Sequence, residues 1–194
     1  GGKLSKIQYF TSESICEGHP DKLADIISDS LLYEFLKQDK YSRVACETFT
    51  TTGQVIVGGE VTTKAYINVP NIIRDIVREV GYTKTEYKFT NDCGVLNAIH
   101  EQSSDIAMGV DRDGAGDQGI MFGGAVRETE DLMPLAISMA KDITNKMTAE
   151  RKCGNLTWAR PDGKSQVTVK YLDGKPLFID SLVFSIQHYS YFTQ

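Results

Sequence analysis

Three short groups of residues along this chain combine acids, bases and glycines at spacings that suit nucleotide chemistry. Residues 114–119, Gly-Ala-Gly-Asp-Gln-Gly, place an acid and an amide among three glycines. Glycine has no Cβ, so such a segment turns tightly and lets a ligand approach the main chain. Its polar side chains could then meet a phosphate, a metal ion or a purine. Residues 17–22 and 160–165 each place an acid and a base in what we expect to be a turn-rich segment. We expect all three groups to belong to one site.

The same spacings argue against several common kinds of site. The glycines of residues 114–119 match neither Gly-x-Gly-x-x-Gly nor the phosphate-binding loop that ends in Gly-Lys-Ser/Thr. The pattern also lacks a series of parallel strands and crossover helices, so a generic NAD-binding module is disfavoured. His19, His100 and His188 lie far apart, and no two of them stand four residues apart on one helix. A zinc hydrolase is therefore disfavoured as well.

The composition is ordinary for a globular protein. The 194 residues, 41% hydrophobic and 24% charged, suit one large domain or two small ones. A net charge of −5 argues against nucleic acid as the main partner, because backbone binding needs a basic face. No apolar stretch reaches membrane-spanning length, so we expect no membrane segment. Four widely spaced cysteines without a Cys-x-x-Cys pair fit a cytoplasmic setting, and we expect all four to be buried, inert thiols.

Hydrophobic periodicity predicts helices mixed with hairpin-forming strands. Helices are expected over residues 22–38, between Asn68 and Gly81, and over residues 134–147. β-rich runs are expected at residues 8–12, 43–50, 54–63, 87–99, 120–126, 167–171 and 177–186. Asp173-Gly174 is the strongest hairpin signal, and Thr51-Thr52-Gly53 joins a second pair of strands. Together these elements predict an α+β fold with at least partly antiparallel sheets.

Six motifs make the chain resemble the S-adenosylmethionine synthetases (methionine adenosyltransferases). They are Thr-Ser-Glu-Ser at 11–14, Glu-Gly-His-Pro-Asp-Lys at 17–22, Val-Ala-Cys-Glu-Thr at 44–48, Val-Gly-Gly-Glu at 57–60, the glycine-rich hexapeptide at 114–119, and Arg-Pro-Asp-Gly-Lys-Ser-Gln at 160–166. The resemblance runs from about Phe10 to His188, and the hexapeptide and the His-Pro-Asp-Lys turn are highly specific to the family. It implies an enzyme that forms S-adenosylmethionine from ATP and L-methionine and releases pyrophosphate and phosphate.

The resemblance also implies a domain organisation. Family members have three α+β domains of mixed sheet and helix, related by an approximate threefold pseudosymmetry. Residues 1–101 would form the N-terminal domain, residues 102–118 the active-site gating loop with the hexapeptide, and residues 119–194 an incomplete central domain. The third domain of the family has no counterpart in this chain.

The predicted gating loop includes Gln102, Arg112 and Asp113. We expect residues 100–113 to be a loop, because they are polar and lack clear periodicity. Asp113 alone joins Arg112 to the hexapeptide, whereas family members usually carry several more residues there. Either the gate is short in this chain, or part of it is left out of the sequence.

The implied reaction needs alignment and charge neutralisation more than a base. The methionine sulfur is already nucleophilic when it attacks C5′ of ATP, whereas the departing triphosphate gains negative charge. The resemblance makes His19 the catalytic residue, an ATP contact that donates to the bridging oxygen. It makes Asp21 a ligand of Mg²⁺, of which two ions per site are expected. From the residues alone, each of the two could simply cap the helix that follows.

Three further positions take ATP-binding roles from the resemblance. Asp117 would bind the adenosine or methionine part of the ligand, although a turn aspartate often only satisfies nearby N–H groups. Asp162 would accept from ribose hydroxyls, and Lys164 would place a point charge on phosphates. On an extended segment these two would face the same way, but a solvated Asp-Gly-Lys turn would also fit the residues alone.

Methionine and potassium sites are implied in the same way. Glu60 would contact the methionine ammonium group, with Gln102 and Asp117 as neighbours of the methionine. Glu47 would be a ligand of K⁺. Taken without the resemblance, a lone strand glutamate usually faces solvent, and a glutamine in a polar loop usually meets water.

Two readings of the whole chain stay open. In the first, ATP and L-methionine are the substrates of a homodimer or homotetramer whose active sites lie between subunits, with residues 43–63 and 87–99 supplying a flat sheet face. In the second, the chain is a truncated, inactive homologue that only binds nucleotide or associates with a longer partner. We expect a polypeptide of only these 194 residues not to form S-adenosylmethionine by itself.

Overall fold

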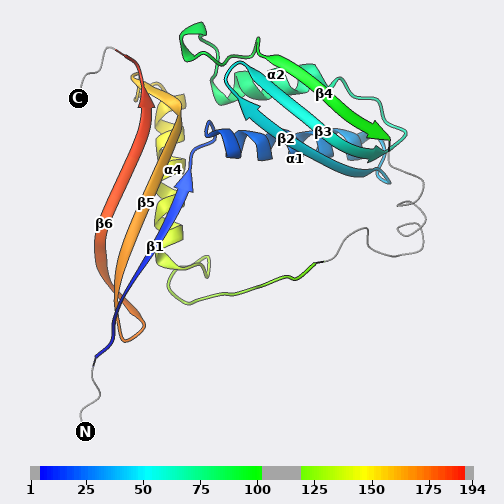
Figure 1. The fold of residues 1–194 in the computed structure, drawn as a ribbon. Helices are drawn as coiled ribbons and strands as arrows, with labels where there is room; N and C mark the ends of the chain where they lie inside the picture. Colours follow the sequence, from blue (N-terminus) through cyan, green and yellow to red (C-terminus); the bar gives the residue numbers. More distant parts are fainter. Residues whose placement is uncertain (1–4, 102–118, 191–194) are drawn as a thin grey trace. The chain divides into compact units, whose positions relative to one another are not determined.

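The computed structural model describes residues 5–101 and 119–190. Its elements, in chain order, are β1 (Ile7–Ile15), α1 (Pro20–Gln38), β2 (Arg43–Thr51), β3 (Gln54–Thr62), α2 (Val69–Val80), the 3₁₀ helix η1 (Thr85–Tyr87), β4 (Gly94–Glu101), α4 (Leu135–Lys152), β5 (Ala159–Leu172) and β6 (Lys175–His188) (Figure 1). They form two compact units, one of Pro20–Phe122 and the other of the chain up to His19 together with the chain from Gly123 onward. Sheets and helices are mixed in both, which confirms the predicted α+β class.

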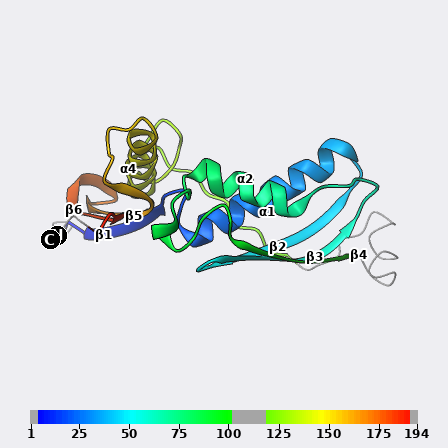
Figure 2. The same ribbon diagram turned by 90° about the horizontal axis from the view of Figure 1, so that it is seen from above.

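The unit Pro20–Phe122 is a sheet with both of its long helices on one face (Figure 2). Its strand order is β2-β3-β4, with β2 antiparallel to β3 and β3 parallel to β4. Helix α1 buries an apolar residue at every fourth position, which gives one continuous stripe: Leu23, Ile27, Leu31 and Phe35. The first three of these pack with the buried face of β3 and with α2, whose core residues include Ile73 and Val77.

The limits of α2 follow from capping residues that the sequence displays. The Asn68 side chain accepts a hydrogen bond of 3.1 Å from the Asn71 N–H, which satisfies one free donor of the first turn. Gly81 ends the helix with a φ of 107°, a left-handed conformation that glycine adopts without a Cβ penalty. The predicted helix between Asn68 and Gly81 is confirmed.

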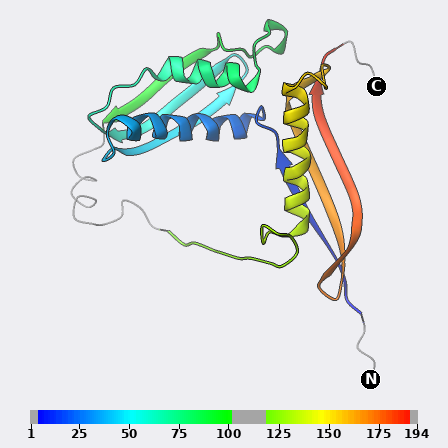
Figure 3. The ribbon, with the colours of Figure 1, turned by 180° about the vertical axis from the view of Figure 1, so that it is seen from behind.

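The other unit is an antiparallel sheet of order β1-β5-β6 with α4 against one face (Figure 3). Its core contains Ala136, Ala140, Val167 and Val169. The Glu128 carboxylate accepts hydrogen bonds from the Leu135 N–H at the start of α4 and from the Tyr171 hydroxyl, at 2.9 and 2.7 Å. Burial, followed by the bond to Glu128, raises the pKa of Tyr171 to about 12. One carboxylate therefore joins the start of α4 to β5.

Strand β1 lies in a different unit from the helix that follows it. All nine of its residues pair with β5, from Ile7 opposite Leu172 to Ile15 opposite Lys164. The chain therefore passes from one unit to the other after His19. The domains predicted from the sequence, residues 1–101, 102–118 and 119–194, are instead consecutive segments of the chain. Those boundaries stay a prediction.

Several predicted elements need correction. The predicted strand at 120–126 is irregular, with Ile120 and Phe122 84% and 95% exposed. Its apolar composition suits a strand, but no pairing in the described residues includes it. The β-rich run at 87–99 is a strand only from Gly94, and that strand continues through His100 and Glu101, where a loop was expected.

The group at 160–165 is also not turn-rich. It lies at the start of the long strand β5, where its residues alternate between a buried and a more exposed face. The predicted helix at 134–147 is present but continues to Lys152, and the short run at 8–12 belongs to the longer strand β1. Within residues 5–101 and 119–190, every helix is too short or too polar to span a lipid bilayer.

Candidate active site

The turn that carries His19 continues the pairing of β1 with β5. Ile15 pairs with Lys164, and beyond the strand the Cys16 N–H donates to the Gly163 carbonyl over 2.8 Å. The His19 N–H then donates back to the Cys16 carbonyl over 3.0 Å, which closes the turn. Strand pairing thus brings the start of the motif group 17–22 next to the motif group 160–165.

Gly18 is the residue that lets this turn lie against β5. A Cβ at Gly18 would come within 2.3 Å of the Pro161 Cβ and 2.5–2.6 Å of the Pro161 backbone carbonyl group. Distances below about 3 Å are not compatible with carbon–carbon contact, so only glycine fits here without movement of the chain. Both Gly18 and Pro161 are buried. The Gly18–Pro161 contact therefore fixes the place of the next residue, His19.

His19 and Lys164 lie close enough to Asp162 to act on its carboxyl electrostatically. Burial raises the pKa of the half-buried Asp162 carboxyl, while the positive charges of His19 and Lys164 act in the opposite direction. On β5, Asp162 and Lys164 share the more exposed face, because the intervening Gly163 lies on the buried face with Pro161. The sequence prediction that Asp162 and Lys164 face the same way is consistent with this alternation.

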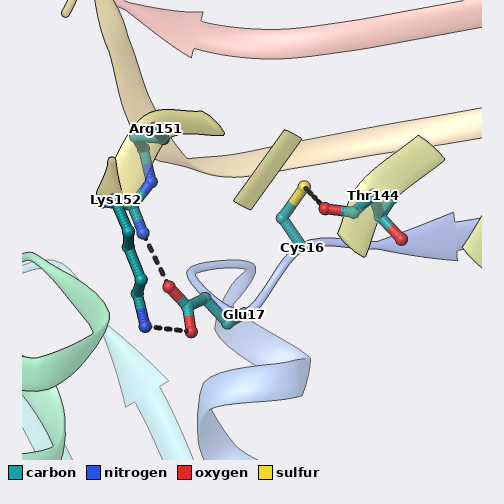
Figure 4. A network of polar contacts seen from close by, with 5 residues as sticks. All are labelled: Cys16, Glu17, Thr144, Arg151 and Lys152. Atoms are coloured by element: carbon teal, nitrogen blue, oxygen red, sulfur yellow. Dashed lines mark hydrogen bonds and ion pairs between the residues drawn. The ribbon is translucent and has the colours of Figure 1, made fainter. Parts of the chain in front are cut away.

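Glu17 ties the same turn to the C-terminal end of α4 (Figure 4). Arg151 Nη2 donates to Glu17 Oε1 over 2.6 Å, and Lys152 Nζ donates to Glu17 Oε2 over 2.8 Å. The Arg151 and Glu17 side chains are only 11% and 20% exposed, whereas Lys152 is 44% exposed. Next to Glu17, the Cys16 thiol donates to the Thr144 carbonyl at 3.9 Å, and burial raises the pKa of this thiol.

Asp21 lies in the first turn of α1, two residues after His19, with its side chain exposed. Its carboxylate is the hard oxygen donor that Mg²⁺ prefers. No group of three or more His, Cys, Asp or Glu side chains in the described residues could hold a metal ion by itself. A single exposed carboxylate fits an ion whose other ligands are phosphate oxygens and water, because Mg²⁺ is usually bound through one or two carboxylates.

Glu47 and Glu60 share the face of the β2-β3-β4 sheet that the helices do not cover. Glu47 pairs with Gly58, and Glu60 pairs with Ala45 on one side and His100 on the other. This register makes the two glutamates diagonal neighbours, about 7–8 Å apart in such a ladder. Gly58 adds no side chain between Glu47 and β4, which leaves room for a small ligand beside the carboxylate.

Gly59 allows the close strand contact beside Glu60. Its φ is 125°, and a Cβ there would lie 1.9 Å from the Ala45 carbonyl oxygen. Position 59 therefore requires glycine for both its backbone conformation and the space available. The two adjacent glycines of residues 57–60 are thus explained differently. Gly59 avoids a clash with the neighbouring strand, and Gly58 leaves the open face of the sheet without a side chain beside Glu47.

Of the third motif group, residues 114–119, the structure describes only Gly119. Asp117 and the predicted gating residues Gln102, Arg112 and Asp113 all lie outside the described ranges. Their predicted roles stay predictions. Among the described residues, the His19 turn and the start of β5 belong to one unit, and Glu47 and Glu60 lie on the sheet of the other.

Some features near the site were missed by sequence reasoning. Arg151 and Lys152 were not singled out, although two basic residues at a helix end are a known stabilising pattern. His100 was assigned to a loop but lies on β4 opposite Glu60. Cys153 is exposed, so the expectation of four buried thiols was wrong for this residue, and Cys46 is only partly buried.

Comparisons with known proteins agree with the motifs. Residues 7–104 match the family described as S-adenosylmethionine synthetase, N-terminal domain, and residues 112–194 match S-adenosylmethionine synthetase, central domain. The chain is 56% identical over 186 residues to S-adenosylmethionine synthase of Fusobacterium nucleatum, covering 95% of this chain and 48% of the relative. It is 54% identical over 192 residues to that of Chlorobium phaeobacteroides, covering 93% of this chain and 48% of the relative. The chain thus spans about half the length of the curated relatives it matches.

Proposed function

This chain belongs to the S-adenosylmethionine synthetase family, and from that premise we propose that the protein it represents is a methionine adenosyltransferase. It would join ATP and L-methionine into S-adenosylmethionine and release pyrophosphate and phosphate. The observation that carries the proposal is the grouping of His19, Asp162 and Lys164, because the turn after β1 packs on the start of β5. This grouping would offer a nucleotide and its phosphates a donor, an acceptor and a cation.

His19 would act on the leaving group. As the C5′–O bond of ATP breaks, negative charge develops on the bridging oxygen, and a placed imidazole N–H can donate to it. Lys164 would hold phosphate oxygens with a point charge. Asp162, half-buried and within electrostatic reach of these two side chains, would accept hydrogen bonds from the ribose hydroxyls. No base is assigned, because the thioether sulfur of methionine attacks without losing a proton.

Metal ions would complete the charge balance. We assign Asp21 as a carboxylate ligand of one of two Mg²⁺ ions, which when bound would neutralise the triphosphate and hold it in line. Glu47 is assigned to K⁺ on the open sheet face. The chain's own contribution is to present Asp21 on the first turn of α1 and to keep the Glu47 carboxylate exposed beside Gly58.

The methionine side of the site is assigned to Glu60, with Gln102 and Asp117. A partly buried carboxylate next to Gly59 suits the ammonium group of an amino acid. Gln102, Arg112 and Asp113 would belong to the gate that excludes water during the displacement.

We propose a homodimer or homotetramer in the cytoplasm, with the open face of the β2-β3-β4 sheet as the subunit contact. That face exposes large apolar side chains, Phe49 at 61% and Leu96 at 47%. An apolar sheet face of this kind is a common protein contact surface. Its glutamates, Glu47 and Glu60, would then lie at the junction between subunits.

The direct test is formation of S-adenosylmethionine from ATP and L-methionine with Mg²⁺ and K⁺. The assay uses the whole polypeptide that contains residues 1–194, because the relatives are about twice as long as this chain. We expect product, pyrophosphate and phosphate in equal amounts. Nucleotide binding without product from that polypeptide would instead support an inactive homologue.

A second expected result concerns Asp21. Asp21→Asn should raise the Mg²⁺ concentration needed for half-maximal rate by about tenfold, since it removes one anionic ligand while keeping the size of the side chain. The measurement is a Mg²⁺ titration of the rate at saturating ATP. Asp25→Asn, exposed one turn later on α1, serves as the control for loss of negative charge. An unchanged titration for Asp21→Asn would leave Asp21 with a helix-terminus role only.

A further inference from the structure

We propose that Glu17, Arg151 and Lys152 form an ion-pair cluster, the Glu17 cluster, that holds His19 in its working position from the α4 side. These three are positioning residues that act through His19, and the inference rests on the proposed function. Nothing in the roles assigned above uses them, although Glu17 stands only two residues before the histidine.

The geometry of the cluster suits a mechanical support. Both oxygens of one carboxylate are engaged, Oε1 by Arg151 at 2.6 Å and Oε2 by Lys152 at 2.8 Å. The Arg151–Glu17 pair is largely shielded from water, so it is less weakened by solvent than an exposed ion pair. Both cations lie in the last turn of α4, where the helix dipole also favours positive charge.

The His19 turn is thereby held from two sides. On the β5 side it is held by the Cys16–Gly163 hydrogen bond and by the contact of Gly18 with Pro161. On the α4 side, the Glu17 cluster joins it to a helix whose own core packs on the same sheet. Removal of either support should leave the fold of the unit in place but loosen the turn.

A loosened turn should affect the chemical step more than the binding of ATP. A misplacement of about 1 Å at a reacting group can cost about 10²-fold in rate. In the proposed function, binding of the nucleotide also depends on Lys164 and Asp162 on β5, which are not members of the Glu17 cluster. A loss in kcat at a nearly constant KM is the signature of a contact needed in the transition state.

Direct phosphate binding by Arg151 is the main alternative, and kinetics separate the two. We expect Glu17→Ala and Arg151→Met each to lower kcat by about 10²-fold, with the KM for ATP within twofold. The double variant should be no worse than Glu17→Ala alone, because Glu17→Ala already removes the pair with Arg151. Arg151→Lys should recover most of kcat, since it keeps a cation near Glu17. A raised KM for ATP in Arg151→Met, without a matching effect of Glu17→Ala, would overturn the proposal and assign Arg151 to phosphate.

The matched control lies on the same helix. Lys146 pairs with Glu150 at a similar distance, 2.8 Å, but its side chain is 76% exposed. Lys146→Met should therefore leave kcat unchanged, because exposed pairs contribute little. If Lys146→Met and Arg151→Met reduced kcat equally, the effect would be a general one of α4 charge, and the proposal would be wrong.

A readout without catalysis separates failure of this inference from failure of the proposed function. In the whole polypeptide, Glu17→Ala and Arg151→Met should speed amide hydrogen exchange at Cys16 and His19 by at least tenfold. Exchange in the β5–β6 hairpin should stay unchanged, which reports that the unit is still folded.

Faster exchange in a protein that makes no S-adenosylmethionine would overturn the proposed function but retain the cluster as the support of the turn. Unchanged exchange at His19 would overturn the inference, whatever the activity. If Glu17→Ala does not fold, the milder Lys152→Met decides, with a smaller but local increase expected.

Discussion

Replacement of His19 by alanine should lower kcat for S-adenosylmethionine formation by about 10²–10³-fold while ATP affinity changes little. The range is that measured when one preorganised donor to a developing negative charge is removed. The physical reason is that the bridging oxygen carries most charge in the transition state, so the contact is strongest there. Since ATP is also held through other groups, including Lys164 in this proposal, its ground-state binding should persist.

The control for this variant is His188→Ala. His188 is exposed at the end of β6. Among the hydrogen bonds of the described residues, its Nδ1 contacts only the carbonyl oxygen of Tyr189, at 2.8 Å. We expect wild-type kcat for it. A large loss of ATP affinity at constant kcat in His19→Ala would instead make His19 a binding residue.

The same variant has a consequence for Asp162 that can be measured by NMR. The positive charge of His19 lowers the pKa of this carboxyl against the larger raising effect of burial. His19→Ala removes the lowering effect, so the Asp162 carboxyl should titrate at higher pH than in the wild type. An Asp162 titration that moves to lower pH would contradict the placement of His19 beside it.

The parts of the fold that the sequence predicts well are those with local causes. Helix α2 begins after Asn68, whose side chain accepts the capping hydrogen bond, and ends at Gly81. Both signals are visible within a few residues. The β5–β6 hairpin turns at Asp173 and Gly174, both of which have positive φ. Such features depend on neighbouring residues in the chain, so a single sequence is sufficient to locate them.

The errors arise where distant pairing decides. Residues 120–126 have the composition of a strand, but a strand forms only with a partner, and the described residues offer none. His100 looked like part of a polar loop, yet it extends β4 because β3 is there to pair with it. The start of β5 looked turn-rich because of its proline and glycine. Pairing with β1 and β6 nevertheless makes it extended.

The candidate site likewise has features that the sequence predicts and features that depend on distant contacts. The motifs predicted that residues 17–22 and 160–165 would meet, and the pairing of β1 with β5 brings the His19 turn to Asp162 and Lys164. The Glu17–Arg151 pair could not be foreseen, because its members are 134 positions apart and no local pattern links them. The contact of Gly18 with Pro161 was equally hidden, since it depends on how closely the turn lies on the strand.

Gly18→Ala should both destabilise the protein and reduce kcat by about 10²-fold. Gly18 has no positive φ, so the backbone conformation itself would accept alanine. The obstacle is steric, because the new methyl group would meet the Cβ and the backbone of Pro161 at 2.3–2.6 Å. Backbone atoms of a paired strand cannot rotate away as a flexible side chain can. The turn must therefore move, and overpacking of this kind costs about 1–3 kcal/mol of the free energy of unfolding.

The loss of activity should exceed what the lost stability explains, because His19 moves with the turn. At a temperature well below the unfolding transition, Gly18→Ala should remain folded yet show the reduced kcat, with the KM for ATP nearly unchanged. Gly124→Ala is the matched control, since no atom lies within 4 Å of its added Cβ and its φ is not positive. Gly124→Ala should keep both the wild-type unfolding midpoint and the wild-type kcat. If Gly18→Ala also kept wild-type stability and kcat, the turn would not lie on Pro161. If Gly18→Ala lost stability but kept kcat, the turn would lie there without positioning the catalytic histidine.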